Sequence, residues 1–175
     1  MAVITTKTEN GLAIKSPYNA EFVSGIKGLL GLWNAADKTW VVPIAVEAEA
    51  RALLRAIYGE DGSPVDRVDL EIEFLADVEE RGEIRFGDTV IAYARGRDSG
   101  AYPGGGIAKI SGTLRSGGSL ANFKVIARAG LRLRMVGVPR PLAARLIADN
   151  NNRVTRVWVE GASNADTTNV VQIRK

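Results

Sequence analysis

Two tryptophans, Trp33 and Trp40, flank a six-residue turn in the stretch GLLGLWNAADKTWVVP, residues 28–43. Across so short a turn, two indole rings can lie side by side and together bury a large apolar surface. Two interpretations are open. Both rings are core anchors of a chain with few aromatic residues, or at least one ring lies at the edge of a basic surface, where it can stack on a nucleic-acid base.

The 175-residue chain contains no histidine and no cysteine. The commonest general base, the commonest metal ligand and every thiol nucleophile or disulfide are therefore missing. Chemistry based on carboxylate, lysine, tyrosine or serine is still possible, but no recognisable local motif for it is present. We expect a protein that is not an enzyme and that has no cofactor and no metal, with a carboxylate-based enzyme as a lesser alternative.

Charged residues are segregated along the chain. Residues 60–94 hold three Lys or Arg against eleven Asp or Glu, and residues 95–156 hold twelve against two. A basic stretch of this kind can attract polyanions. The alternative is that the acidic and basic segments are neighbouring strands whose charges neutralise each other, and the sequence leaves both open.

Four cations of the basic segment alternate with apolar residues in two expected strands, 122–128 and 131–136. If Ala129 and Gly130 form a tight turn, the two strands pair and align the four side chains on one face. The result would be a basic ribbon suited to a sugar-phosphate backbone. Its members are Lys124, Arg128, Arg132 and Arg134.

A glycine-rich stretch, SGAYPGGGIAKISG at residues 99–112, is interpreted as a loop between strands because the phosphate-loop motif GxxxxGK[ST] is absent. Tyr102 and the flanking cations Arg95, Arg97 and Lys109 could still bring this loop into contact with nucleic acid. Three carboxylates upstream, at positions 69, 71 and 73, share one face of a strand. We interpret them as a solvated strand face rather than as a metal cluster.

The elements that must position the tryptophans follow the order strand, helix, hairpin, helix. The first helix is expected to be capped by Asn19 and to end at Gly31, and the second is expected to end at Gly59. The core residues expected on the two helices are Phe22, Ile26, Leu29, Val46, Ala50, Leu53 and Ile57. The strands are Leu12–Ile14 and the hairpin arms 32–33 and 39–42, joined by the turn NAADK.

The second part of the chain is predicted to be rich in antiparallel strands, so the fold class is α+β. We expect a βαββα module over residues 1–59, a linker or turn over 60–66, and a β-rich α+β region over 67–175 that is either separate from the module or packed on it as one unit. The expected strands are 68–74, 88–95, 106–115, 122–128, 131–136, 153–159 and 169–174, with a helix at 139–150.

Residues 12–59 resemble the HARP domain, which is found beside annealing-helicase motors and in phage and bacterial proteins. The resemblance is carried by a helix with Tyr-x-x-x-Phe/Leu and a Lys, an aromatic before a turn that holds a Lys, and then Trp with an apolar pair. Tyr18, Phe22, Lys27, Trp33, Lys38 and Trp40 fill these places. Leu32 departs from the pattern, because family members commonly carry a basic residue there.

The resemblance and the charge pattern together predict a non-catalytic accessory protein that binds nucleic acid. Single-stranded or branched DNA, or RNA, is the expected partner, because aromatics and backbone cations do not read duplex base edges. The alternative is a phage- or plasmid-borne protein-interaction module that inhibits or assists a host complex.

No membrane-spanning run or signal sequence is evident, so a soluble, cytoplasmic protein is expected. Exposed sheet edges favour a homo-oligomer. The candidate nucleic-acid-binding residues are Tyr18, Lys27, Trp33, Lys38, Trp40, Arg95, Arg97, Lys124, Arg128, Arg132 and Arg134.

Overall fold

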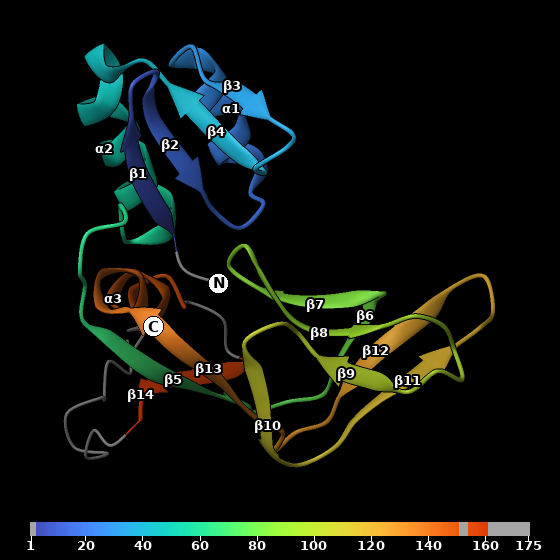
Figure 1. Cartoon of the computed structure of the whole chain (residues 1–175). Helices are drawn as coiled ribbons and strands as arrows, with labels where there is room; N and C mark the ends of the chain where they lie inside the picture. The colour runs from blue at the N-terminus through green and yellow to red at the C-terminus, as the bar shows by residue number, and fades with distance from the viewer. Residues whose placement is uncertain (1–2, 151–153, 161–175) are drawn as a thin grey trace, which may run out of the picture. The chain divides into compact units, whose positions relative to one another are not determined.

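The computed structural model describes residues 3–150 and 154–160, which form three α-helices and fourteen β-strands in an α+β fold (Figure 1). The chain divides into two compact units. The N-terminal unit contains the residues up to Arg67 together with Pro139–Leu142. The β-rich unit contains Val68–Val138 and the described residues from Ala143 on. The expected strand at 169–174 lies outside the described residues.

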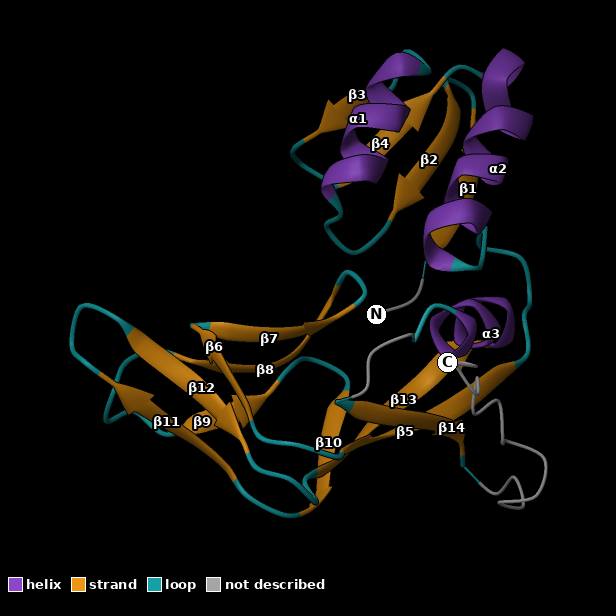
Figure 2. Ribbon diagram, turned by 180° about the vertical axis from the view of Figure 1, so that it is seen from behind, coloured by secondary structure: helices purple, strands orange, loops and turns teal. Residues whose placement is uncertain are grey.

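The N-terminal unit is a four-stranded antiparallel sheet in the order β1-β2-β4-β3. Both of its long helices, α1 and α2, lie on the same side of this sheet (Figures 1 and 2). The elements are β1 (Ile4–Thr8), β2 (Gly11–Lys15), α1 (Ala20–Gly28), β3 (Leu32–Asn34), β4 (Thr39–Val42), a 3₁₀ turn (Ile44–Val46) and α2 (Glu47–Tyr58). The predicted strand, helix, hairpin and helix are all present, and β1 is an additional strand that the sequence pattern did not indicate.

Helix α1 begins and ends through local backbone chemistry. Asn19 caps its first turn, because its Oδ1 accepts a hydrogen bond of 2.9 Å from the Phe22 amide. At the other end, the amide of Gly31 donates to the carbonyl of Ile26 at 2.8 Å, while Leu30 takes the left-handed conformation with φ of 60°. Gly31 was expected to end this helix, but the left-handed residue is Leu30, one position earlier. At Gly31 an added Cβ would come within 2.6 Å of the Ile26 carbonyl oxygen.

The core of the N-terminal unit lies between the sheet and the two helices. Its buried residues are Val3, Leu12, Ile14, Phe22, Ile26, Val42, Ala50 and Leu54. The predicted apolar stripe of α2 is turned relative to the expectation, because Leu54 is fully buried whereas Leu53 and Ile57 are only partly buried. Leu53 instead packs on α1 at Gly25, where an added Cβ would lie 2.8 Å from Leu53 Cδ2.

The segment 60–66, expected to be a linker or turn, begins with two buried acidic residues that hold it to neighbouring parts of the chain. Glu60 accepts a hydrogen bond of 2.9 Å from the Val3 amide and pairs with Arg67, and Asp61 pairs with Arg55. Burial alone would raise the pKa of Asp61, but hydrogen bonds from Ser63 and Arg55 outweigh it and lower the pKa. This segment is therefore tied to the N-terminal unit and is not a free linker.

The β-rich unit holds three sheets, with strand orders β10-β13-β5-β14, β11-β12-β6 and β7-β8-β9. Its strands are β5 (Arg67–Phe74), β6 (Val78–Arg81), β7 (Glu83–Phe86), β8 (Thr89–Ala94), β9 (Ala101–Pro103), β10 (Ile107–Ser111), β11 (Leu114–Gly118), β12 (Phe123–Ala127), β13 (Arg132–Pro139) and β14 (Thr155–Val159), and α3 spans Arg140–Ala148. The strand expected at 106–115 is two strands in different sheets, broken at Gly112, whose φ is 83°. Residues Ala101–Pro103, which belong to the stretch 99–112 that was expected to be loop, form the edge strand β9. Over residues 3–150 and 154–160, no helix is both long enough and apolar enough to cross a membrane.

We predict that Leu54→Ala lowers the free energy of unfolding of the N-terminal unit by about 2 to 5 kcal/mol, because it leaves a cavity in a fully buried site. Leu53→Ala should cost only about 1 to 2 kcal/mol, because that side chain is partly exposed. Urea denaturation can be followed by tryptophan fluorescence in a Trp158→Phe background, so that only Trp33 and Trp40 report. Equal costs, or a larger cost for Leu53→Ala, would contradict the packing described above.

Candidate nucleic-acid interface

The two tryptophans of the N-terminal unit face each other across the β3–β4 hairpin. Trp33 pairs directly with Trp40 in the sheet register, and their ring centroids are 5.4 Å apart at an interplanar angle of 56°. Asn34 shapes the turn by accepting from the Ala36 amide and donating to Asp37, and Lys38 closes it with φ of 55°. Trp40 packs on the core, whereas Trp33 is 52% exposed. One ring is thus a core anchor and the other offers part of its surface to solvent.

Polar and apolar side chains are both exposed in this unit. In the described part of the chain, neither Lys27, in the last turn of α1, nor Lys38 has an acidic group within 4 Å. Tyr18, which precedes α1, is 86% exposed. Leu30 and Leu32 are also largely exposed, and they are apolar. The predicted residues of the N-terminal unit are therefore accessible, apart from Trp40.

The predicted basic ribbon of the β-rich unit does not form. Strand β12 pairs with β11 and β6, whereas β13 pairs with β10 and β5 in another sheet. The expected pairing of these two strands around Ala129 and Gly130 is wrong. The reason is local, because the Gly130 amide donates to the Phe74 carbonyl at 2.8 Å and the Phe74 amide donates to the Leu131 carbonyl. These bonds place the start of β13 next to the end of β5, and not next to β12.

Arg132 and Arg134 of β13 share one buried carboxylate on β5. Glu71, which is only 4% exposed, pairs with Arg132 and lies 2.9 Å from Arg134. Arg134 also pairs with Glu160 at 2.5 Å, and Arg132 lies over the Trp158 ring at 5.4 Å from its centroid. The acidic face of this strand is thus covered by arginines, and the prediction of a solvated face is wrong at Glu71.

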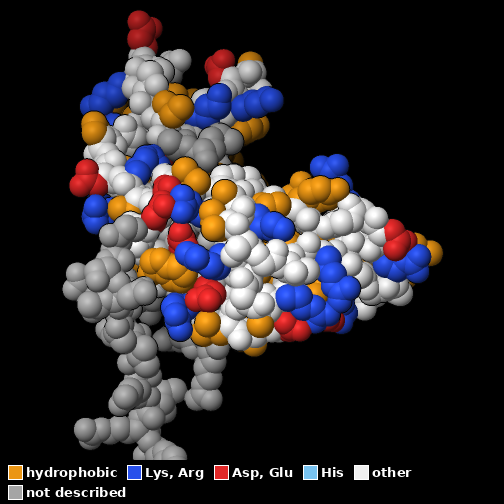
Figure 3. Space-filling view, turned by 90° about the horizontal axis from the view of Figure 1, so that it is seen from below, with side chains coloured by type: hydrophobic (Ala, Val, Ile, Leu, Met, Phe, Trp, Pro, Cys, Tyr) orange, Lys and Arg blue, Asp and Glu red, His pale blue; other side chains and the backbone are white. Residues whose placement is uncertain are grey.

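Three more cations of the basic segment also have acidic partners. Lys124 lies 3.3 Å from Glu79, Arg128 pairs with Asp77, and Arg97 lies 2.8 Å from Asp98. On the face drawn in Figure 3, Lys and Arg side chains lie beside Asp and Glu side chains rather than forming one continuous basic surface. The alternative in which acidic and basic segments neutralise each other therefore describes most of this unit.

Two of these pairs, at Glu71 and Asp77, lower the pKa of their carboxylates and so favour the ionised form. Burial would raise the pKa of Glu71, but hydrogen bonds from Arg134 and Arg132 outweigh it and lower that pKa below its usual value of 4.5. The Ala129 amide and Arg128 lower the pKa of Asp77 in the same way. A carboxylate whose pKa is lowered on folding stabilises the folded state above its unfolded pKa, and that stabilisation is lost as the pH falls through the lowered value.

A second aromatic pair, which sequence reasoning did not single out as a pair, lies beside an arginine without an acidic partner. Tyr93 on β8 and Tyr102 on β9 face each other with ring centroids 5.9 Å apart, and the Arg95 guanidinium lies over the Tyr93 ring at 5.9 Å from its centroid. No acidic group lies within 4 Å of Arg95 among the residues described. We call these three side chains the tyrosine–arginine cluster. The signal was available, because Tyr-x-Arg in a strand puts both side chains on one face.

Hydrogen bonds order the loop that carries this cluster. The Arg95 amide donates to Ser99 Oγ at 3.1 Å, and the Tyr102 hydroxyl donates to the Ser99 carbonyl at 2.7 Å. Tyr102 is 48% exposed. The cluster therefore presents a ring and a cation on a defined backbone, an arrangement that can stack on a flat group and contact a phosphate.

Comparison of the chain with family models, with curated proteins and with solved structures finds no match in any of the three. Within the described ranges, no three carboxylates gather in a group that could hold a metal ion. The candidate site therefore rests on the geometry of its side chains.

We predict that Glu71→Gln destabilises the β-rich unit by about 2 to 3 kcal/mol, because it leaves two partly buried arginines without a carboxylate. The matched control is Glu73→Gln on the same strand face, which loses only one pair, 3.6 Å long, to the largely exposed Arg156 and should cost well under 1 kcal/mol. Thermal unfolding above pH 5 measures both. The difference between wild type and Glu71→Gln should shrink as the pH falls below about 4.5, and a difference that is independent of pH would count against the pair.

Proposed function

We propose that the protein binds single-stranded or branched nucleic acid without catalysis. The observation that carries the proposal is the tyrosine–arginine cluster, in which a guanidinium without an acidic partner in the described chain lies over the partly buried Tyr93 ring, beside the exposed Tyr102. Most other cations of the basic segment are engaged by carboxylates. Arg95 has no carboxylate within 4 Å in the described chain and lies over an aromatic ring, so it is well placed to meet a phosphate beside a stacked base.

The chemistry of the cluster suits unpaired bases. A base has an apolar face that stacks on an aromatic ring, and each stacked base contributes about 1 to 3 kcal/mol with little dependence on sequence. The adjacent guanidinium can contact the phosphate that follows the base. In a duplex the faces of the bases are already stacked, so a single strand, a branch or a loop is the preferred form.

The N-terminal unit supports the same proposal. Trp33 is half exposed, and Lys27 and Lys38 have no acidic partner within the described residues. These are also positions that carry the resemblance to the HARP domain. That resemblance stays a prediction, and it would add this surface as a second contact for the same class of ligand.

We predict that the protein binds oligo-dT and that log affinity falls linearly with log salt, by about 0.7 per phosphate contacted. Arg95→Ala should lower the slope by about 0.7. Tyr102→Ala should weaken binding by about 1 to 3 kcal/mol with little change in slope, because the ring stacks and carries no charge. Fluorescence anisotropy of a labelled oligonucleotide between low and moderate salt gives both values.

The matched control is Arg85→Ala in the same three-stranded sheet, because Arg85 is paired with Glu83 at 2.7 Å. Its slope should change far less than that of Arg95→Ala. Circular dichroism establishes that each variant is folded. A wild-type protein without detectable DNA or RNA binding at low salt would defeat the proposal.

The fluorescence of Trp33 can be measured separately in a variant that carries Trp40→Phe and Trp158→Phe, which leaves Trp33 as the single tryptophan. We predict that its fluorescence is quenched on adding oligo-dT and that Trp33→Ala weakens binding by about 1 to 3 kcal/mol. If the quenching is absent while binding persists, the ring is structural and the N-terminal unit does not take part.

A protein-interaction module is the second candidate, and one observation favours it. Leu30 is 69% exposed and Leu32 is 75% exposed; Leu32 is the first residue of the edge strand β3, next to Trp33, and Leu30 shortly precedes it. Adjacent exposed apolar side chains on a small unit are typical of a surface that meets another protein. If oligonucleotides fail to bind, substitution of both leucines by Ser would be the first test in a search for a protein partner or a second copy of this chain.

A further inference from the structure

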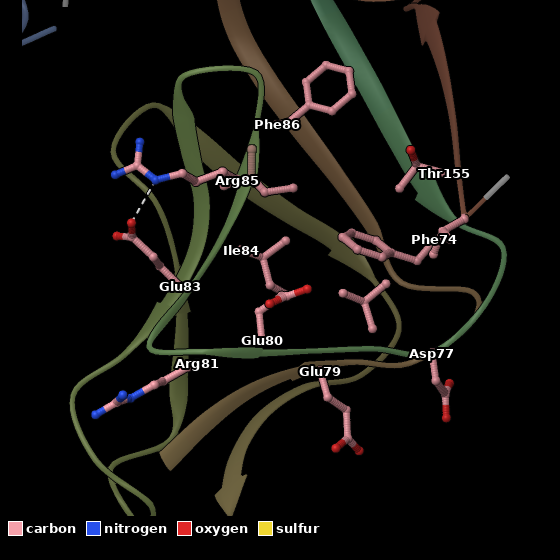
Figure 4. A pocket seen from close by; sticks show the side chains of 13 residues that line it. Phe74, Asp77, Glu79, Glu80, Arg81, Glu83, Ile84, Arg85, Phe86 and Thr155 are labelled. Atoms are coloured by element: carbon pink, nitrogen blue, oxygen red, sulfur yellow. Dashed lines mark hydrogen bonds and ion pairs between the residues drawn. The ribbon is translucent and has the colours of Figure 1, made fainter. Parts of the chain in front are cut away.

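The β-rich unit contains a cavity that the nucleic-acid proposal does not use. Its volume is about 710 Å³, within the range of about 300 to 1,000 Å³ of small-molecule sites. The apolar side chains that line it come from β5, β6, β7, β8 and the residue before β14, and they are Phe74, Val78, Ile84, Phe86, Ile91 and Val154. Figure 4 shows Phe74, Ile84 and Phe86 around its centre.

Most charges at the cavity already have partners. Asp77 pairs with Arg128, Glu79 lies 3.3 Å from Lys124, and Glu83 lies 2.7 Å from Arg85. Figure 4 shows Asp77 and Glu79 pointing to the opposite side of β6 from Phe74 and Ile84. These carboxylates therefore form their ion pairs outside the apolar part of the cavity.

Glu80 is different because its side chain, although exposed to solvent, lies on the side of β6 that carries the apolar lining. In the pairing of β6 with β12, Val78 is opposite Ala127 and Glu80 is opposite Val125, and both of these partners are fully buried. Figure 4 shows Glu80 on the side of the strand that carries Ile84 and Phe74. Among residues 3–150 and 154–160, no Lys or Arg nitrogen lies within 4 Å of its carboxylate. Arg81, the next residue, alternates to the other face of the strand.

We propose that this cavity binds a small organic cation with an apolar body, and that the ammonium group pairs with Glu80. A carboxylate over an apolar floor has only water to offset its charge, and a cation that reaches it gains both an ion pair and burial of the ligand's apolar part. An anionic ligand of the same shape would meet repulsion at the same point. This site is independent of the nucleic-acid proposal, because it shares no residue with the tyrosine–arginine cluster or with Trp33.

The test compares two probes of similar size and opposite charge, 4-phenylbutylamine and 4-phenylbutanoate, on the full chain by ¹⁵N NMR titration. We expect the amine to shift the amides of Ile84, Phe86 and Ile91 and to bind at least tenfold more tightly than the carboxylate. Glu80→Gln should weaken binding of the amine by about tenfold or more, because a hydrogen bond to a charged group is lost. The matched control Glu79→Gln removes the same charge from the outer face and should change the affinity less than threefold.

A charge reversal keeps the proposal falsifiable. Glu80→Lys, at an exposed position, should invert the preference, so that 4-phenylbutanoate binds more tightly than the amine. Amide spectra without ligand show whether each variant keeps the fold. Equal binding of the two probes to wild type, equal losses from Glu79→Gln and Glu80→Gln, no inversion in a folded Glu80→Lys variant, or no shift at the cavity would each overturn the proposal.

Discussion

The contact of Glu71 with Arg132 and Arg134 holds two cations of the β-rich unit on a buried carboxylate and so withdraws them from contact with a ligand. A carboxylate that is almost fully buried in a sheet is stable only when cations and hydrogen bonds replace its water. Two arginines do so here, both from the neighbouring strand. Because the acidic and basic segments meet in the same sheets, the charge separation seen along the sequence largely disappears in the folded chain. In the part of this unit that the structure describes, only a small number of cations have no carboxylate partner, and their positions say more about where a ligand could bind than the net charge does.

The sequence was most informative where structure depends on neighbouring residues. The caps at Asn19 and Gly59 and the turn at Asn34 and Asp37 are local chemistry, and they were predicted. The rotation of α2 was missed because Leu53 and Leu54 are adjacent leucines, and only the position of the helix on its sheet determines which of them is buried. The helical period of apolar residues does not by itself decide which of two adjacent leucines faces the core.

Longer-range pairing could not be derived in the same way. A short turn at Ala129 and Gly130 favours a hairpin, yet the hydrogen bonds of Phe74 with Gly130 and Leu131 direct β13 to a different sheet. The partner strand is more than fifty residues away in sequence, and no local signal reveals it. The ribbon inferred from Lys124, Arg128, Arg132 and Arg134 failed for this reason. Tyr102 and Arg95 were named from the sequence, but the part of Tyr93 was missed because β9 was expected to be loop, which hid the pairing of Tyr102 with Tyr93.

The central claim is that Arg95, and not the arginines on Glu71, meets nucleic acid. It is tested most directly by following the side-chain Nε–Hε signals of the arginines by NMR while oligo-dT is added at low salt. We expect the Arg95 signal to shift in a saturable manner and the Arg132 and Arg134 signals to stay in place, because their guanidinium groups are engaged by Glu71. Shifts at Arg132 and Arg134 with none at Arg95, or no shift at any of the three, would contradict the account.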